Sequence, residues 1–490
     1  MASFRQETKL HFVLVPLAAQ GHLIPMIDMA HLLAERGVRT SLVTTPANAA
    51  RIKPIINRVH ELDLPIQFIE LAFPGAKFGL PEGCESMELI PRGFFRHFFD
   101  AVYLLSEPFE LFLKNLGSAP DCIITDMSSA WTGPVARKFG IPRVIFHGPS
   151  CFYISAAHNL ETHKVYDHVS DIFEFVTVPD FPVEVEVNKA QTPGFFNFPG
   201  LEDIRKMVLE EQSTADGVVV NTFDELEKPF IEHYERVIGK RVWTIGPTCL
   251  CNKDIDAKSS RGNKEAVDRN KVLTWLDQRD DGSVLYSNFG SAAYSNHLQL
   301  IEIATGLEAS KRPFILVIKK KEIVPEIEKW LSDGFEERVK DRGLILTGWV
   351  PQMVILSHPA IGGFMTHCGW NSTLEAISMG VPMITWPHFA DQFLNEKLVV
   401  DVLNIGISIG VKMPNLGSDV VMVRSHDIEK AVPALMEEGN EGKERRDRVR
   451  DLAYKAKKAV EEEGSSWKNL ADMISYFVEY GRNNEGKIED

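Results

Sequence analysis

Side chains that could bind a ligand are concentrated in one stretch, residues 349–392, with the sequence WVPQMVILSHPAIGGFMTHCGWNSTLEAISMGVPMITWPHFADQ. Aromatic, imidazole, amide, hydroxyl and carboxylate groups follow one another there at short intervals, between two apolar pieces of the kind that form strands. A segment that only packs has little use for such a mixture. The stretch therefore indicates a binding site.

The middle of this stretch predicts a strand, a turn and a helix. The apolar run of residues 361–365 leads into THCGWNST, and a helical pattern begins at Leu374. The NST of residues 371–373 consists of types that cap helices, and Gly380 followed by Pro382 predicts the helix end. The N-terminus of such a helix can hold a phosphate. His367 would lie beside it.

As a whole, the stretch resembles the signature box of plant family-1 glycosyltransferases that use UDP-sugars, in its length and in its internal HCGWNSTLE. By this resemblance Trp349 stacks on uracil, Gln352 lies near the ribose and base, and Glu375 accepts hydrogen bonds from the ribose hydroxyls. The helix N-terminus and neighbouring side chains would neutralise the diphosphate. The expected donor-binding residues are Ser291, Trp349, Val350, Gln352, His367, Gly369, Trp370, Asn371, Ser372, Glu375, Asp391 and Gln392.

The end of the box would bind the sugar. Asp391 and Gln392 are expected to contact hexose hydroxyls, with a backbone or ring contact from Trp370. In the family a final Gln goes more often with glucose and a final His with galactose. The resemblance therefore implies UDP-glucose as donor, with UDP-xylose and UDP-galactose as alternatives.

Ser291 belongs to a separate segment, FGSA, which follows the apolar run of residues 283–289. By resemblance, Ser291 donates a further hydrogen bond to the phosphate. Ser287 and Asn288 depart from the apolar and Ser/Cys residues that precede this segment in the family.

A general base is predicted near the start of the chain. His22 follows Gly21 at the start of a helical pattern, where the helix N-terminus disfavours the imidazolium and is expected to keep the ring neutral at pH 7. Asp126, at the end of the apolar run DCIIT, could hold the other ring nitrogen and stabilise the charged ring as a proton moves. Both residues match the family's catalytic pair, through GHLIPM and through a D-x-x-x-x-W pattern that ends at Trp131.

Aromatic clusters are the candidates for the acceptor pocket. The phenylalanines of residues 94–99 have a helical spacing that favours a core role, whereas those of residues 195–198 lie in a segment rich in Pro and Gly and are better placed to touch a ligand. The candidate acceptor residues are Phe94, Phe95, Phe152, Phe195, Phe196 and Phe198.

The elements that must position these groups form two series of alternating strands and helices. Residues 10–16, 38–45, 66–71, 121–125, 144–147 and 217–221 are apolar runs typical of buried parallel strands, and helical patterns lie between them, including a long one over 94–116. A second series runs from residue 283 through the box to helical stretches near residues 425 and 441. We find neither G-x-G-x-x-G nor GxxxxGK[ST], which argues against dinucleotide oxidoreductases and P-loop ATPases.

The family resemblance implies the α/β GT-B fold, in which two Rossmann-like domains with parallel sheets face a central cleft. We expect an N-terminal acceptor-binding domain over residues 1–247, a linker over 248–270, and a UDP-sugar-binding domain over 271–465. A C-terminal helix over 466–490 is expected to pack back on the N-terminal domain. Residues 252–266, charged and without periodicity, belong to the linker.

Composition narrows the partners. The net charge of −15 comes from 53 basic and 68 acidic residues, and no basic cluster interleaves with aromatics, which disfavours nucleic acid and acidic membranes. The six cysteines show no CxxC spacing, and neither a signal peptide nor an apolar run of about 18 residues is found. We expect a cytoplasmic, monomeric protein without integral membrane association, whose partners are small molecules.

No metal or cofactor is expected. Asp254 and Asp256 spell the D-x-D that holds divalent metals in other glycosyltransferases, but they lie in the charged linker and are interpreted as solvated charges. The diphosphate would instead be bound by a helix dipole, His367 and amides.

The predicted function is inverting transfer of glucose from UDP-glucose to a hydroxyl of a plant secondary metabolite, most simply a flavonoid or other phenolic. The alternatives are an O-glucosyltransferase for a terpenoid or steroid, and a C-glucosyltransferase acting on a phenol ring. A nucleotide-sugar binder without catalysis would have no reason to keep both His22 and Asp126.

Overall fold

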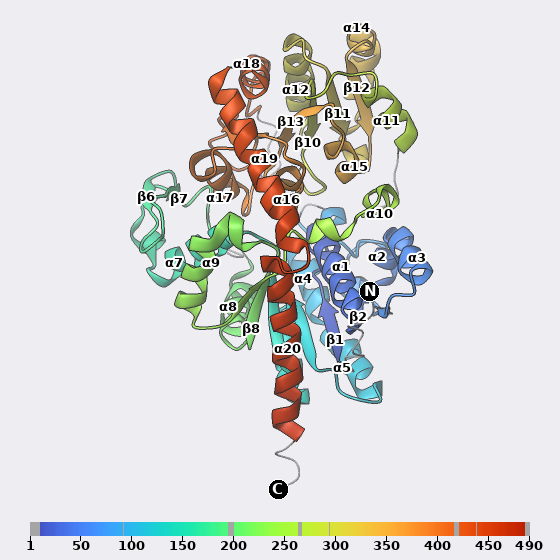
Figure 1. Ribbon diagram of the computed structural model, residues 1–490, viewed down its shortest axis with the longest axis vertical. Coiled ribbons are helices and arrows are strands. Elements are labelled where there is room, and N and C mark those ends of the chain that lie inside the picture. The colour runs from blue at the N-terminus through green and yellow to red at the C-terminus, as the bar shows by residue number, and fades with distance from the viewer. Residues whose placement is uncertain are drawn as a thin grey trace.

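The computed structural model describes residues 10–91, 93–194, 200–262, 267–293, 295–415, 421–437 and 439–485. Two α/β units are visible, one below the other in Figure 1. The N-terminal unit is built on a parallel sheet whose strand order is β3 (Ile66–Glu70), β2 (Arg39–Thr44), β1 (His11–Val15), β4 (Cys122–Asp126), β5 (Arg143–His147), β8 (Gly217–Val220) and β9 (Val242–Thr244). β1, β4, β5 and β8 are buried along their whole length, as expected for strands covered by helices on both faces.

The C-terminal unit repeats this arrangement. Its parallel sheet has the order β12 (Gly343–Thr347), β11 (Phe314–Ile318), β10 (Val284–Asn288), β13 (Ile361–Thr366), β14 (Met383–Thr385) and β15 (Gly406–Ser408). A separate antiparallel hairpin joins β6 (Phe175–Thr177) to β7 (Glu186–Asn188).

Helices connect and cover the strands of both sheets. Those of the N-terminal unit are α1 (Gln20–Glu35), α2 (Pro46–Arg51), α3 (Lys53–Glu61), α4 (Phe95–Tyr103), α5 (Ser106–Asn115), α6 (Thr132–Phe139), α7 (Cys151–Thr162), α8 (Glu202–Ser213) and α9 (Asp224–Ile238). Those that follow are α10 (Ile255–Ser260), α11 (Arg269–Leu276), α12 (His297–Ala309), α13 (Pro325–Trp330), α14 (Glu336–Val339), α15 (Gln352–Leu356), α16 (Trp370–Met379), α17 (Gln392–Lys397), α18 (Ser425–Met436), α19 (Asn440–Val460) and α20 (Ser465–Glu485).

In both sheets, strands are added first on one side of the first strand and then on its other side. The strand order therefore reverses between β1 and β4 and between β10 and β13. Ligands of open parallel sheets bind beyond the carboxyl ends of the strands at such a point. His22 follows β1 and Asp126 ends β4, while Ser291 follows β10 and His367 follows β13. The topology thus brings the predicted catalytic pair and the predicted phosphate site to the two switch points.

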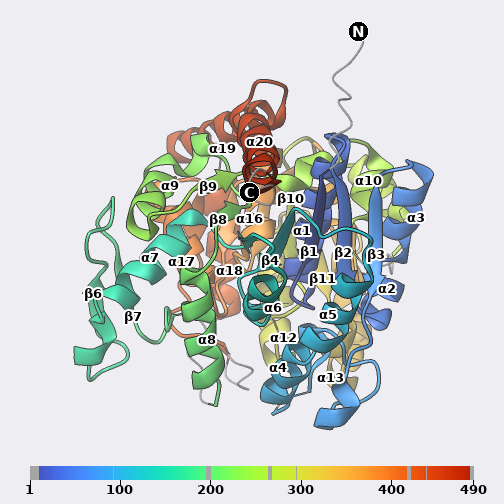
Figure 2. The ribbon, with the colours of Figure 1, turned by 90° about the horizontal axis from the view of Figure 1, so that it is seen from below.

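The last helix leaves the C-terminal unit and lies on the N-terminal sheet. α20 packs against β9, and Figure 2 looks along it. The rings of Phe477 and Phe12 meet edge to face at 5.3 Å, and the indole N–H of Trp243 donates to Asp472 at 2.8 Å. Within the described part of the chain, none of the helices combines the length and the apolar character that crossing a bilayer requires.

Two expectations about elements are corrected. The helix predicted over residues 94–116 is divided into α4 and α5 at Leu104 and Leu105. Pro108 explains the break, because it has no N–H to donate to the carbonyl of Leu104.

The predicted linker, where no periodicity indicated a helix, contains α10, which Asp254 caps by accepting from the Ala257 N–H at 2.7 Å. The two D-x-D carboxylates form ion pairs, Asp254 with Arg58 and Asp256 with Arg269.

Candidate active site

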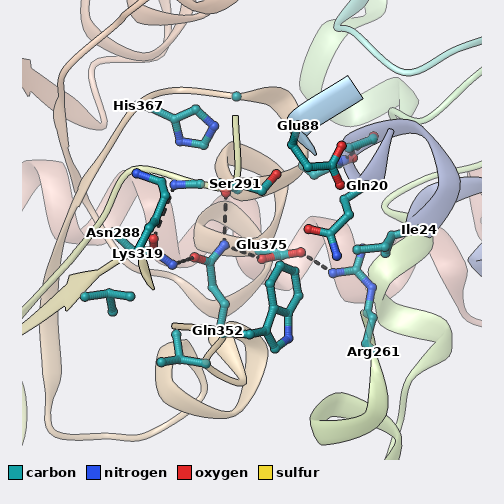
Figure 3. Close-up of a pocket in the computed structure, with 18 of the residues that line it drawn as sticks. Gln20, Ile24, Glu88, Arg261, Asn288, Ser291, Lys319, Gln352, His367 and Glu375 are labelled. Atoms are coloured by element: carbon teal, nitrogen blue, oxygen red, sulfur yellow. Dashed lines mark hydrogen bonds and ion pairs between the residues drawn. The ribbon is translucent and has the colours of Figure 1, made fainter. Parts of the chain in front are cut away.

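A cavity of about 580 Å³ lies between the two sheets and is lined by residues of both units. Figure 3 shows its donor side, with Gln352, Glu375 and Arg261 in a row and His367 and Ser291 above them. Of the residues predicted from the sequence, those that line it are His22, Ser291, Trp349, Val350, Gln352, His367, Gly369, Trp370, Asn371, Ser372, Glu375 and Asp391. These residues predicted from the sequence therefore line one cavity, although the strands and helices that carry them are far apart in the chain.

His22 lies in the first turn of α1, and its ring is a quarter exposed. Its Nδ1 is 2.7 Å from Oδ2 of Asp126, whose other oxygen accepts from the Ser128 N–H at 2.8 Å. A carboxylate only accepts, so the proton in the first of these bonds belongs to Nδ1. Nε2 is then left as the acceptor, which is the arrangement a general base needs.

The direction of the pKa shift expected for His22 is corrected. Burial lowers the pKa of His22, but Asp126, through its charge and hydrogen bond, and then Asp391 and Glu88 outweigh burial, and the pKa is raised above its usual value. The helix N-terminus alone predicts the opposite direction. Three carboxylates around one imidazole dominate because charges act more strongly in a partly buried site.

His367 occupies a niche made by two glycines. A Cβ at Gly290 would lie 2.5 Å from its Cε1, and a Cβ at Gly369 would lie 2.4 Å from its Nε2. Its Nδ1 is buried and, among the described residues, has no hydrogen-bond partner. Burial and then Lys319 lower the pKa of His367 to about 3. The ring is therefore neutral before ligand binds, so it can donate a hydrogen bond but supplies no cation.

Positive charge reaches the cavity from a segment that the sequence analysis did not single out. Lys319, Lys320 and Lys321 follow β11 and line the cavity. Lys319 is paired with Glu322 at 2.9 Å, and Lys321 donates to the carbonyl of Ser291 at 3.3 Å. The run KKK was visible in the sequence, but such a run normally marks a solvated surface.

A chain of hydrogen bonds orders the predicted ribose site. Asn288 donates to Oε1 of Gln352 at 2.9 Å, which turns the Gln352 amide N–H toward Oε2 of Glu375 at 2.7 Å and toward Oγ of Ser372 at 2.9 Å. Asn288 also donates to Tyr286 at 2.8 Å. The departure from the family pattern at Asn288 therefore has a structural use here.

The helix cap predicted at residues 371–373 is wrong. α16 begins at Trp370, its N-cap is Gly369 without a side-chain cap bond, and the three polar residues lie within its first turn. Backbone N–H groups at this end are thereby left for a ligand. The predicted end at Gly380 is confirmed, with φ +71° and its N–H donating back into the helix.

Two of the predicted UDP-sugar-binding residues also form hydrogen bonds between the domains. Pro25 has no N–H, so the Gly21 carbonyl in α1 lacks its helical partner. Asn371 supplies that partner from the other domain by donating to Gly21 at 2.7 Å. The indole N–H of Trp370 donates to the carbonyl of Asn221 at 2.8 Å.

Asp391 lies beside His22 and is positioned by Asn395. The Asn395 amide donates to Oδ2 of Asp391 at 2.7 Å and to the Cys368 carbonyl at 2.9 Å. Burial raises the pKa of Asp391 to about 6, although Asn395 and His22 act to lower it. Gln392 does not line the cavity, and its side-chain oxygen accepts from the N–H groups of His388 and Phe389.

The backbone is strained at two residues that adjoin predicted ligand-binding side chains. Cys368, directly after His367, and Ala390, directly before Asp391, have φ of +63° and +57°. Such a conformation costs about 1–3 kcal/mol for a residue with a Cβ and is typical of functional sites.

Comparison with known proteins identifies the family. A family model described as UDP-glucoronosyl and UDP-glucosyl transferase matches residues 261–441, and one described as Glycosyltransferase, N-terminal domain, matches residues 8–249. UDP-glycosyltransferase 73E1 of Stevia rebaudiana is 46% identical over 477 residues, which cover 95% of this chain and 96% of that protein. The chain belongs to the plant family-1 UDP-glycosyltransferases.

Solved structures support the same assignment. Glycyrrhiza uralensis UGT73P12, complexed with glycyrrhetinic acid 3-O-monoglucuronide, matches this UDP-glycosyltransferase with a TM-score of 0.89 and 36% identity, covering 98% of each chain. Phytolacca americana UGT2, complexed with UDP-2fluoro-glucose and pterostilbene, has a TM-score of 0.74 and 28% identity, covering 95% of this chain and 99% of that one. The predicted GT-B fold is confirmed. The UDP-glycosyltransferase transfers a sugar to a small-molecule acceptor.

The described candidate acceptor residues of the UDP-glycosyltransferase pack away from the cavity. Phe152 is fully buried and packs edge to face on Phe230 and Phe181, so it belongs to the core. Phe94 and Phe95 pack beside the buried cluster around α4 and do not line the cavity. Phe195, Phe196 and Phe198 lie outside the described residues.

Proposed function

We propose that this UDP-glycosyltransferase transfers glucose from UDP-glucose to a hydroxyl of a plant secondary metabolite with inversion at C1. His22 Nε2 accepts the hydroxyl proton while the oxygen attacks C1, the bond from C1 to the diphosphate oxygen breaks, and UDP leaves with its electron pair. The observation that carries this proposal is the His22–Asp126 pair at 2.7 Å in the cavity that Asp391 also lines. From UDP-α-glucose the product is a β-glucoside.

The same cavity also holds groups that can stabilise the negative charge of the leaving diphosphate. The N-terminus of α16 offers backbone N–H groups and a partial positive charge, His367 offers a neutral donor, and the lysines after β11 supply cations. We propose that transfer needs no metal. Activity that is lost with EDTA and restored by manganese would contradict this part of the proposal.

The sharpest test is His22→Ala. Product formation from UDP-glucose is expected to fall by at least about 100-fold, as when a general base is removed, while UDP binding measured by calorimetry stays within about twofold of the wild-type value, because His22 acts on the acceptor. His31→Ala, a change on the same helix outside this cavity, is the matched control. Full O-glucosylation by the His22 variant would overturn the assignment.

Two observations bear on the donor. Asp391 lines the same cavity as His22, as a residue that binds sugar hydroxyls should, and the Phytolacca americana relative is described with UDP-2fluoro-glucose. Both support UDP-glucose. A competition series with UDP-glucose, UDP-galactose and UDP-xylose, read by product mass, tests the preference.

For the acceptor, a flavonoid or other phenolic is the expectation from the sequence. The relative described with glycyrrhetinic acid 3-O-monoglucuronide, a glycosylated triterpenoid, favours the terpenoid alternative because it matches with a TM-score of 0.89. A mass-detected screen with flavonoids, triterpenes, steroids and simple phenols separates the two. Acid hydrolysis of the product then distinguishes an O-glucoside, which is cleaved, from a C-glucoside, which resists.

A further inference from the structure

The segment between the domains places a buried arginine in the cavity wall. Arg261, one residue after α10, directs Nε to Oδ2 of Asp28 at 2.9 Å and Nη1 to Oε1 of Glu375. The three side chains are at most 7% exposed. Asp28 lies on α1, the helix that carries His22, and Glu375, whose ion pair with Arg261 is visible in Figure 3, lies on α16. One guanidinium thus joins these two helices.

Both ends of this bridge are held by further partners. The Asn252 amide donates to Oδ1 of Asp28 at 2.9 Å, so Asp28 is a fixed anchor for the guanidinium. At the other end, Gln352 donates to Oε2 of Glu375 at 2.7 Å. Each Glu375 oxygen therefore has one donor and keeps lone-pair capacity for another hydrogen bond. The carboxylate is oriented but not saturated.

The same segment packs against Trp349, the residue predicted to stack on uracil. Gly262 is packed so tightly on Trp349 that a Cβ there would lie 2.3 Å from Cζ2 of the indole, and its φ of +109° favours glycine. Lys258 of α10 and Arg261 both line the cavity. Between them, the inter-domain segment and α16 enclose the place where a ribose would meet Glu375.

We infer that Arg261 is a positioning residue for the nucleotide ribose, acting through the carboxylate of Glu375 while Asp28 holds it in place. This inference rests on the proposed function, because it assumes that Glu375 receives the ribose hydroxyls of the UDP-sugar. Arg261 fixes the direction of the Glu375 lone pairs before the donor arrives. Preorganisation of this kind raises affinity by reducing the ordering needed on binding.

A merely structural bridge makes a different prediction. If Arg261 only joins the domains, its loss weakens the binding of every nucleotide alike. If it acts through Glu375, its loss should cost more affinity for UDP, whose ribose offers Glu375 both hydroxyls, than for dUDP, which keeps only the 3′-hydroxyl. UDP and its 2′-deoxy analogue dUDP differ in the 2′-hydroxyl alone and are the probes.

The experiment uses Arg261→Lys, which keeps a cation between the two carboxylates but cannot fork to both as a guanidinium does. Calorimetry with UDP and dUDP measures affinity, and initial rates with UDP-glucose measure KM and kcat. We expect wild-type protein to prefer UDP to dUDP by about tenfold, as for a hydrogen bond to a charged group. In Arg261→Lys this preference should fall to about twofold or less, with KM for UDP-glucose raised and kcat changed by less than about threefold.

Arg58→Lys is the matched control, because Arg58 pairs with Asp254 beside α10 at 2.6 Å but does not line the cavity. It should keep the wild-type preference. If Arg261→Lys does not fold, Asp28→Asn is the alternative variant. It keeps the pair between Arg261 and Glu375 but weakens the anchor of Arg261, so it should also reduce the preference for UDP over dUDP.

An unchanged preference for UDP in the folded Arg261 or Asp28 variant, or equal losses for UDP and dUDP, would overturn the inference. Absence of UDP binding by wild-type protein would instead overturn the proposed function. The two failures are therefore distinguishable.

Discussion

At the scale of single residues, the proposed base His22 and its partner Asp126 predict how activity depends on pH. The base must be deprotonated, and because the pKa of His22 is raised, mainly by Asp126, kcat/KM for the acceptor at saturating donor should still be rising above pH 6.5. Asp126→Asn removes that carboxylate, so the acid limb should move to lower pH. The plateau should also fall, by about 100-fold, because the imidazolium loses its stabilising charge.

The control for this prediction is Asp121→Asn, which changes another carboxylate beside β4 that bonds the His11 N–H away from the cavity. It should leave the position of the acid limb unchanged. An acid limb that stays in place in Asp126→Asn would show that His22 is not the titrating base.

Asp391 predicts a second pH effect, on the donor. Its pKa of about 6 means that it is ionised at pH 7.5 and mostly protonated at pH 5. A protonated carboxyl accepts hydrogen bonds more weakly, so KM for UDP-glucose should rise as the pH falls through about 6. In Asp391→Asn, KM should be high and nearly independent of pH over this range. A KM that is flat in the wild-type protein would remove Asp391 from the sugar site.

The residues of the box could be predicted from the sequence because the motif itself specifies them. Arg261 could not, since its role arises from burial between Asp28 and Glu375, each more than 100 residues away in the chain. His22 illustrates a partial success. Its position at a helix start was readable, but the carboxylates of Asp391 and Glu88 that raise its pKa come from distant segments.

At the scale of elements, the proline in α1 is compensated by the other domain. Asn371→Ala should lower the free energy of unfolding in urea by about 1–2 kcal/mol, because the Gly21 carbonyl, which Pro25 cannot bond, would lose the Asn371 donor. In a Pro25→Ala background the new N–H restores the helical bond, and the same Asn371 change should cost about 1 kcal/mol less. Equal costs in both backgrounds would show that the inter-domain hydrogen bond is not coupled to Pro25.

Strands were more predictable than helices. The apolar runs correspond to β1, β4, β10 and β13 within a residue or two, because a strand buried on both faces must be apolar throughout. Helix ends depended on details that periodicity does not show, such as Pro108 in the first turn of α5, just after the break from α4, and the glycine cap of α16. The bulk of Phe152 was equally uninformative, since a phenylalanine looks the same in a core and in a pocket.

At the scale of the whole molecule, the two domains divide the work and are joined at the cleft and by the last helix. The predicted base lies on α1 of the N-terminal domain, whereas the donor groups follow strands of the C-terminal sheet. Inter-domain bonds from Asn371, Trp370 and Arg261 lie beside the cavity. The residues that join the two domains therefore also line the cavity.

Far from the cavity, α20 should contribute to the stability of the N-terminal domain. Phe477 is 1% exposed and packs on Phe12 and Trp243. Phe477→Ala should lower the free energy of unfolding by about 3–5 kcal/mol, because the large buried ring leaves a cavity between α20 and the sheet.

Tyr454→Ala on α19, where the side chain is 63% exposed, serves as the control and should change stability by less than about 0.5 kcal/mol. Because α20 contributes no residue to the cavity lining, the folded Phe477 variant at low temperature should keep the KM for UDP-glucose of the wild-type protein. Equal stability of the two variants would mean that the C-terminal helix is not part of the N-terminal core. A raised KM in Phe477→Ala would instead show that α20 holds the domains in the relative position that the donor site requires.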